Sequence, residues 1–161
     1  MTSAFKFFAV VGFCAITGLG LNACSSSDGV TQGDIDAFKA SYSSSLAGLS
    51  TQAVLTGSAL QDLFDAKFLD SGFSRADIVA ALNGEASAIQ SASGYSSVPQ
   101  VTLANASVTD CVGTTQGDLI CTLSGTLSNQ DADVTSVQFT TQLRMADGKL
   151  RLYGDQLTAF N

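Results

Sequence analysis

Two cysteines in the second half of the chain are spaced for a disulfide bond. Cys111 and Cys121 flank the segment VGTTQGDLI, whose midpoint, Gln116, falls in a predicted turn over residues 113–117. In an antiparallel hairpin centred there, the two cysteines lie opposite each other at the Cα separation that a disulfide requires, about 4.5–5.5 Å. By strict alternation, Cys121 shares a face of the sheet with apolar residues, whereas Cys111 shares a face with polar ones. A β-bulge between them would resolve this mismatch. The alternatives are two buried free thiols or a metal site, which would lack further ligands.

The absence of histidine limits the chemistry that the rest of the chain can perform. With no histidine among 161 residues, histidine general bases, Ser-His-Asp and Cys-His arrangements and ordinary zinc sites are all excluded. The formal net charge of −7 comes with no basic stripe, so we expect no nucleic-acid partner and no docking onto anionic lipid headgroups.

Four aspartates between residues 62 and 77 could attract a cation. Asp62 and Asp65 would share one side of a helix, with Asp70 and Asp77 nearby in the sequence. Their spacing does not match the Asp-x-Asp-x-Asp-Gly calcium loop, and carboxylates on a solvated helix are the ordinary explanation. We therefore expect no metal and no cofactor.

The amino-terminal segment has the composition of an export signal. One lysine, Lys6, precedes the apolar run FFAVVGFCAITGLGL from Phe7 to Leu21, which is short for a membrane span. The run ends in Leu21-Asn22-Ala23-Cys24, which resembles the lipobox of bacterial lipoproteins, with Asn22 where a smaller residue is commoner. An uncleaved anchor or an ordinary secretory signal is the alternative.

The lipobox resemblance implies a location as well as a modification. It assigns residues 1–23 to a signal peptide, a diacylglyceryl group to the Cys24 thiol, and an acyl chain such as palmitate to the new amine. Residues 24–33 become a flexible tether, and residues 34–161 a single domain. Two or three acyl chains hold a protein firmly, because each buried methylene contributes about 0.8 kcal/mol. In a Gram-negative cell, Ser25 favours the outer membrane, on its periplasmic side. Export would also place Cys111 and Cys121 in an oxidising compartment.

Three helices are predicted before residue 99. Residues 34–49 and 58–71 carry apolar side chains at helical spacing, and a third helix follows Ser74 and extends to about Ile89. Thr31 with Asp34, and Ser74 with Asp77, have the spacing of capping boxes at two of the starts. Pro99 and the serines around it end the helical half.

The apolar period changes from about 3.6 to about 2 after Pro99. Four strands are predicted there, at residues 101–112, 118–128, 134–145 and 149–160. The Asp147-Gly148 pair favours a two-residue hairpin turn. Pairing from that turn sets Met145 opposite Leu150, Leu143 opposite Leu152 and Phe139 opposite Gln156. One face is then apolar and lies under the helices, and the other carries Gln138, Gln142, Arg144, Arg151 and Tyr153.

The segments LFDAKFLDSGFSRADIVAAL and VQFTTQLRMADGKLRLYGDQ resemble the nuclear transport factor 2-like superfamily, which includes polyketide-cyclase-like proteins and ketosteroid isomerase. This resemblance implies an α+β fold in which three N-terminal helices pack on a curved four-stranded antiparallel sheet and leave a conical pocket. The side chains expected to line that pocket are apolar or aromatic: Phe38, Tyr42, Phe64, Phe68, Phe139, Leu143 and Leu152. Tyr153 and Asp155 fall on the polar face, so no isomerase role is transferred to them.

The leading hypothesis is a non-catalytic envelope domain that binds a small apolar ligand or another envelope protein. The rivals are a pocket enzyme of isomerase or cyclase type that uses aspartate and tyrosine, and a purely structural envelope protein with a filled core. The first requires an aspartate with a raised pKa inside the pocket, and the second requires the absence of a cavity. A homodimer also fits, because the sheet has an exposed edge strand.

Overall fold

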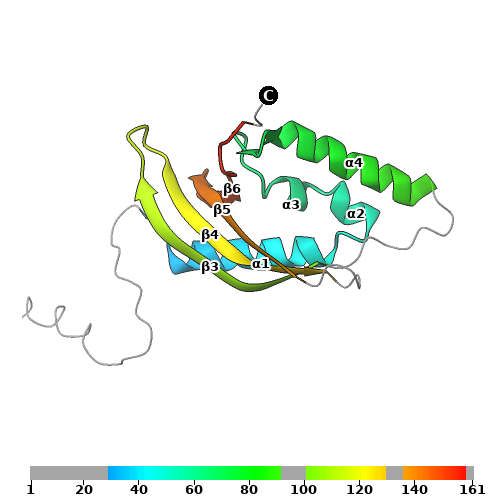
Figure 1. The fold of residues 1–161 in the computed structure, drawn as a ribbon, viewed down its shortest axis with the longest axis horizontal. Helices are drawn as coiled ribbons and strands as arrows, with labels where there is room; N and C mark the ends of the chain where they lie inside the picture. Colours follow the sequence, from blue (N-terminus) through cyan, green and yellow to red (C-terminus); the bar gives the residue numbers. More distant parts are fainter. Residues whose placement is uncertain (1–28, 92–100, 130–135, 159–161) are drawn as a thin grey trace, which may run out of the picture.

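The computed structural model describes residues 29–91, 101–129 and 136–158 as helices on a four-stranded antiparallel sheet (Figure 1). The predicted α+β fold class is therefore confirmed. The signal peptide, Cys24 and Pro99 lie outside the described residues. Helix α1 (Gln32–Ala47) begins inside the segment predicted as tether, because Thr31 already caps it. Within the described ranges no helix is long and apolar enough to cross a bilayer.

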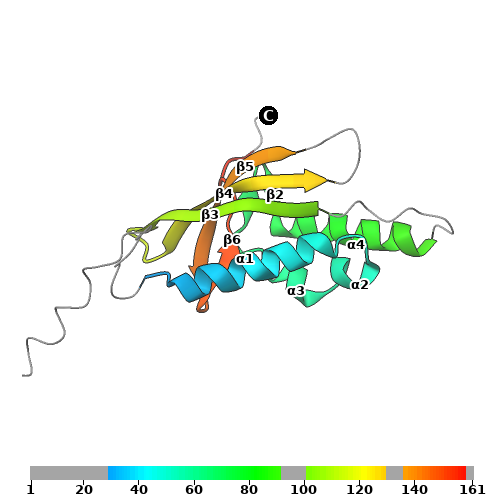
Figure 2. The same ribbon diagram turned by 90° about the horizontal axis from the view of Figure 1, so that it is seen from below.

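The sheet has the order β3-β4-β5-β6, which is the order of its strands in the chain. Its strands are β3 (Val101–Gly113), β4 (Leu119–Asn129), β5 (Val137–Ala146) and β6 (Lys149–Leu152). Register shifts interrupt the β3–β4 pairing after Ala104 and after Thr109. Such bulges bend and twist a strand, and the long strands curve around the helices (Figure 2).

The β5–β6 hairpin has the predicted turn and the predicted register near it. Asp147 and Gly148 both have positive φ, as a two-residue hairpin turn requires, and Met145 pairs with Leu150 and Leu143 with Leu152. The expected pairing of Phe139 with Gln156 is wrong, because β6 ends at Leu152. The N–H groups of the two residues after β6, Tyr153 and Gly154, both donate to the Gln142 carbonyl. The N–H of Gln156 donates to the Leu69 carbonyl at 2.9 Å.

Gly154 makes this change of partner possible. Its φ of +81° is unfavourable for other residues, and an added Cβ would lie 2.6 Å from the carbonyl carbon of Leu69. The carboxyl-terminal segment therefore passes against β1 (Leu69–Asp70), which pairs with β2 (Phe73–Ser74), instead of extending the sheet.

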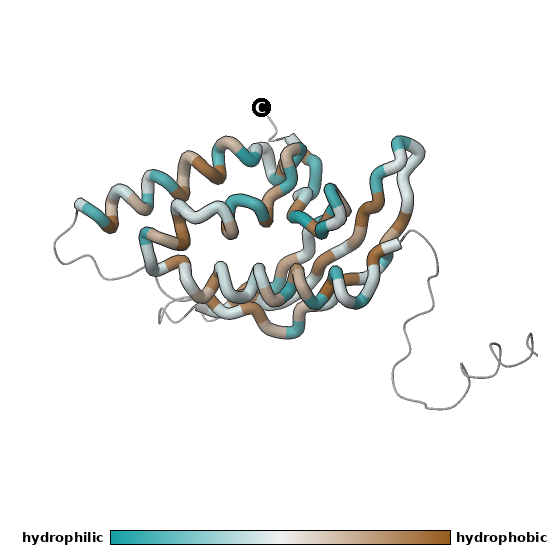
Figure 3. The backbone as a smooth tube through the Cα atoms, turned by 180° about the vertical axis from the view of Figure 1, so that it is seen from behind, coloured by the Kyte–Doolittle hydropathy of each residue, from teal (hydrophilic) through white to brown (hydrophobic). Residues whose placement is uncertain are grey.

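The two long helices begin at the predicted capping boxes. The Thr31 and Asp34 side chains each accept from the other residue's backbone N–H, and Ser74 and Asp77 do the same at the start of α4 (Arg75–Ser91). Hydrogen bonds from the Thr31 and Ser74 side chains lower the pKa values of Asp34 and Asp77. Along α4 the residue colours alternate between apolar and polar, as expected for an amphipathic helix (Figure 3).

The helix predicted over residues 58–71 is wrong in extent. The chain forms one-turn helices α2 (Gln52–Leu55) and α3 (Ser58–Gln61) and then leaves the helical path. The Leu63 carbonyl accepts from the Leu152 N–H at 2.7 Å, and the Asp65 N–H donates to the Leu152 carbonyl at 2.9 Å. Backbone pairing with β6 therefore replaces the expected second helix.

The core lies between α1, the segment after α3 and the inner face of the sheet. Leu123 and Leu143 are fully buried, and Phe38 of α1 is 4% exposed. All seven side chains predicted to line a pocket belong to this core or pack against it. The predicted residues thus come together, and Phe38, Phe68, Leu143 and Leu152 belong to one buried cluster.

Cys111 and Cys121 are joined by a disulfide across the second register shift. Their sulfur atoms are 2.08 Å apart and their Cα atoms 4.0 Å apart. Asp110, with a φ of 52°, forms part of the bulge that brings Cys111 to face Cys121. Cys121 is 1% exposed, so the bond ties the bulged edge strand to the core.

We expect the Cys111→Ala, Cys121→Ala double variant to lose about 2–3 kcal/mol of unfolding free energy, because the bond closes a short loop in the unfolded chain. Urea denaturation with and without reductant measures this loss. Reductant should lower the stability of the unchanged protein and leave that of the double variant unaltered. Equal stability of the two proteins under oxidising conditions would contradict the prediction.

Candidate binding groove

A groove runs along α1 and separates it from α3 and the β5–β6 turn. Its volume is about 570 Å³. Helix α1 supplies more than half of the lining, and the remainder comes from α3, the two residues after it, the β5–β6 turn and the first two residues of β6. The lining residues are Asp34, Ala37, Phe38, Ala40, Ser41, Ser44, Ser45, Ala59, Asp62, Leu63, Gly148, Lys149 and Leu150.

The groove exists because the facing side chains are small. Positions separated by three or four residues share one face of a helix, and α1 places Ala37, Ser41 and Ser44 on that face. Ala59 of α3 also lines the groove. Alanine and serine leave space along this face, whereas larger side chains would fill it.

The floor of the groove is apolar and its walls are polar. Phe38, Leu63 and Leu150 are each at most 6% exposed and form the floor. Asp62 and Lys149 carry opposite charges on the walls, and neither side chain makes an ion pair or hydrogen bond within the described ranges. The groove can therefore bury an apolar group and still offer charged and hydroxyl partners.

The residues predicted to line a pocket only partly coincide with this groove. Of the seven, Phe38 is the one that lines it, and the others pack in or against the core. Tyr42 lies with its ring centroid 5.6 Å from that of Phe38, and burial raises the pKa of its phenol. Tyr42 is therefore neutral at physiological pH.

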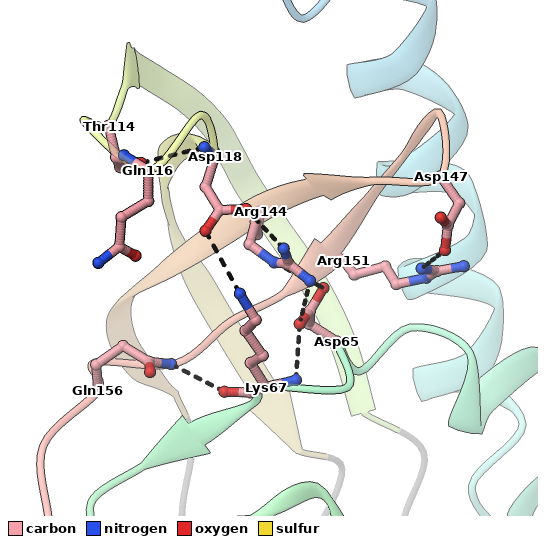
Figure 4. A network of polar contacts seen from close by, with 9 residues as sticks. All are labelled: Asp65, Lys67, Thr114, Gln116, Asp118, Arg144, Asp147, Arg151 and Gln156. Atoms are coloured by element: carbon pink, nitrogen blue, oxygen red, sulfur yellow. Dashed lines mark hydrogen bonds and ion pairs between the residues drawn. The ribbon is translucent and has the colours of Figure 1, made fainter.

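A second polar cluster lies on the outer face of the sheet (Figure 4). The Arg144 guanidinium donates to Asp65 through Nε at 3.0 Å and Nη2 at 2.8 Å, and to Asp118 through Nη1 at 2.7 Å. Asp65 is completely buried and also accepts from the Lys67 N–H at 2.8 Å. The Tyr153 ring centroid lies 5.8 Å from the Arg144 Cζ.

This outer cluster fastens two loops to the sheet. Asp65 holds the segment after α3, and Asp118 holds the β3–β4 turn, through the same guanidinium. The Asp65 carboxylate in turn raises the pKa of Arg144. The expectation that Asp65 is a solvated helix carboxylate is therefore wrong, and Arg144 on the predicted polar face is covered.

The four aspartates weighed as a cation site do not converge. Asp65 binds Arg144, Asp70 accepts from the Thr141 hydroxyl at 3.3 Å, and Asp62 lies in the groove. In the part of the chain that the structure describes, no three acidic or cysteine side chains gather closely enough to hold a metal ion. Asp155 accepts from the backbone of Ser71 and Leu157 and so stabilises a turn.

Comparison with known proteins reveals distant structural matches and no family. No family model and no curated protein matches the chain. A protein of unknown function with a cystatin-like fold from Nostoc punctiforme is 14% identical, covers 79% of this chain and 91% of its own, and has a TM-score of 0.48. Aln2 from a Streptomyces species is 14% identical, with 79% and 90% coverage and a TM-score of 0.42. ActVI-ORFA from Streptomyces coelicolor is 16% identical, with 76% and 91% coverage and a TM-score of 0.41. Matches this distant carry no information on ligand or activity.

Sequence reasoning missed most of the groove and the Asp65–Arg144 pair. A signal for the groove was present, because Ala37, Ser41 and Ser44 form a small-residue face beside the apolar face of α1. Nothing local indicates the partner of Asp65, since Arg144 is 79 residues away in the chain.

Acid is expected to weaken the fold through its hydrogen-bonded carboxylates. The hydrogen bond from Arg144 lowers the pKa of Asp118, and the backbone N–H of Leu157 lowers that of Asp155, as capping does for Asp34 and Asp77. A pKa below the unfolded value, about 3.9, gives stability that is present above that pH and lost as the pH falls through the folded pKa. Melting temperatures measured from pH 7 to pH 3 should be level at first and decline below about pH 4. A melting temperature that rises on acidification would contradict this prediction.

Proposed function

We propose that this protein is an envelope lipoprotein, held to a membrane through Cys24, whose folded domain binds a small ligand in the groove along α1 without transforming it. The groove is the observation that carries this proposal. Its volume of about 570 Å³ falls within the range typical of small-molecule sites, roughly 300–1,000 Å³. An apolar floor with a few polar groups is also the usual composition of such sites.

Two features support binding in preference to catalysis. The chain has no histidine, which is the commonest general base. A serine nucleophile needs an adjacent base, and no described hydrogen bond joins Ser41, Ser44 or Ser45 of the groove to a carboxylate. The helices-then-sheet order agrees with the resemblance to the nuclear transport factor 2-like superfamily, which contains both binders and enzymes.

The anchor is supported by the amino-terminal sequence. An apolar run of signal-peptide length ends in Leu21-Asn22-Ala23-Cys24, followed by three serines before the folded domain. Acyl chains on Cys24 would hold the protein at the envelope, and Ser25 favours the periplasmic side of the outer membrane in a Gram-negative cell. The short segment from Cys24 to Thr31, the cap of α1, would keep the groove near the membrane surface.

Filling the groove tests the proposed binding site. Ala59 lines it, so an Ala59→Trp variant should occupy it, whereas Ala81→Trp places the same side chain on an exposed position of α4 outside the lining. The full chain in lipid nanodiscs is screened by saturation-transfer NMR against small aliphatic and aromatic amines, acids and amides. Compounds that bind the unchanged protein and Ala81→Trp should lose binding to Ala59→Trp. Equal binding by all three proteins would place the site elsewhere.

Intact mass spectrometry of protein extracted from native membranes tests the anchor. We expect a chain that begins at Cys24 and carries fatty acyl groups, because processing at a lipobox leaves the modified cysteine first. A Cys24→Ala variant should remain unprocessed and without lipid. An unmodified chain that begins at residue 1 would overturn the anchor.

A further inference from the structure

The unpaired charges of the groove indicate what kind of ligand it takes. Asp62 and Lys149 both line it, and no ion pair joins them to each other or to another group within the described ranges. We propose that the groove binds a short apolar peptide by its free ends, with the ammonium at Asp62 and the carboxylate at Lys149. This inference rests on the proposed function of the groove.

The length of the groove suits a peptide of a few residues. Its lining follows α1 from Asp34 to Ser45, which at about 1.5 Å per residue corresponds to about 16 Å. An extended peptide spans about 3.3–3.6 Å per residue, so a peptide of up to about four residues fits along it.

The two charges enter the groove from different elements. Asp62 directly follows α3 and precedes Leu63, whose carbonyl accepts from the Leu152 N–H, whereas Lys149 is the first residue of β6. A ligand with its two charges separated along its length can reach both, and a peptide has its free ends at opposite ends of the chain. The carboxylate of Asp34, in contrast, is engaged with Thr31 in the capping box.

The remainder of the lining suits the body of such a ligand. Phe38, Leu63 and Leu150 form an apolar floor that can cover aliphatic side chains. Ser41 and Ser44 line the α1 wall and are exposed, and each hydroxyl can donate to or accept from a peptide group. Side chains and backbone of the peptide would thus meet matching surfaces.

Isothermal titration calorimetry with trileucine tests this proposal on the full chain in nanodiscs. N-acetyl-trileucine and trileucine amide each remove one terminal charge and should bind at least tenfold more weakly, since hydrogen bonds between charged groups are the strong ones. In Asp62→Asn the acetylated and free peptides should bind alike, and in Lys149→Gln the amide and free peptides should bind alike. Asp36→Asn and Lys39→Gln are matched controls on α1 outside the lining and should retain the full preference.

The outcomes separate this inference from the proposed function. The peptide inference fails if blocked and free peptides bind equally well. It also fails if the only compounds that bind are screening compounds whose binding Ala59→Trp abolishes. In both cases the groove remains a ligand site. Binding of glycerophosphoethanolamine in place of trileucine, with the same dependence on Asp62 and Lys149, would assign the groove to a lipid headgroup and also overturn the inference. If neither trileucine nor any screening compound binds, both proposals fail.

Discussion

Replacing Arg144 with methionine is expected to lower the free energy of unfolding by about 3–5 kcal/mol. Asp65 is completely buried and takes two hydrogen bonds from this guanidinium, so the variant leaves a buried carboxylate with the Lys67 N–H as its remaining described donor. The loss also removes the Arg144 hydrogen bond to Asp118 and leaves the exposed Lys67 ammonium, 3.7 Å away, as the ion-pair partner of that carboxylate on the β3–β4 turn. Urea denaturation followed by circular dichroism measures the change.

Arg151→Met is the matched control for this prediction. Arg151 lies directly opposite Arg144 on β6, but its partner Asp147 is 87% exposed, and exposed ion pairs contribute about 0–1 kcal/mol. A double variant with Asp65→Asn and Arg144→Met should be more stable than Arg144→Met alone, because it removes the unpaired charge. A double variant less stable than the single one would contradict this account of the cluster.

Leu143→Ala is expected to cost about 2–5 kcal/mol, because it leaves a cavity in a filled core. Leu143 is completely buried and packs in one cluster with Phe38 and Leu152. Val137→Ala is the control on the same face of β5, since Val137 is 53% exposed and its truncation should change stability by no more than about 0.5 kcal/mol. Thermal and urea unfolding of both variants checks the difference. Similar small losses in the two would show that the space around Leu143 is open.

Local chemistry was enough to predict several parts of the fold. The capping boxes at Thr31 and Ser74 depend on side chains three residues away, and the Asp147-Gly148 turn depends on two adjacent residues. Alternation on β5 then placed Leu143 on the buried face and Arg144 on the opposite one. Each of these features is decided by residues close together in the chain.

Contacts between distant segments decided the parts that were missed. Apolar spacing favours a helix after Ser58, but pairing of Leu63 and Asp65 with Leu152 and the buried contact with Arg144 draw the chain out of it. Gly154 likewise ends β6 early because its neighbour is Leu69, far away in sequence. Local propensity is a weak prior that such tertiary contacts override.

The candidate site was predictable only in part. Phe38 was expected at a pocket and lines the groove, but Asp62 and Lys149 were not expected there. A groove is the space that two packed elements leave, so its position depends on how α1, α3 and the β5–β6 turn meet. Sequence spacing gives the faces of each element and leaves the distance between them undetermined.

The central claim is that the groove along α1 is the binding site. Its most direct test is to map the chemical-shift changes that a ligand causes in the protein. Isotope-labelled full chain in nanodiscs is titrated with trileucine or, if that fails to bind, with the tightest compound from the screen. We predict the largest shifts at Ser41, Ser44, Leu63 and Leu150, which line the groove. Shifts centred on Phe139 and Tyr42, with none at the groove, would contradict the account and place the ligand between the helices and the sheet.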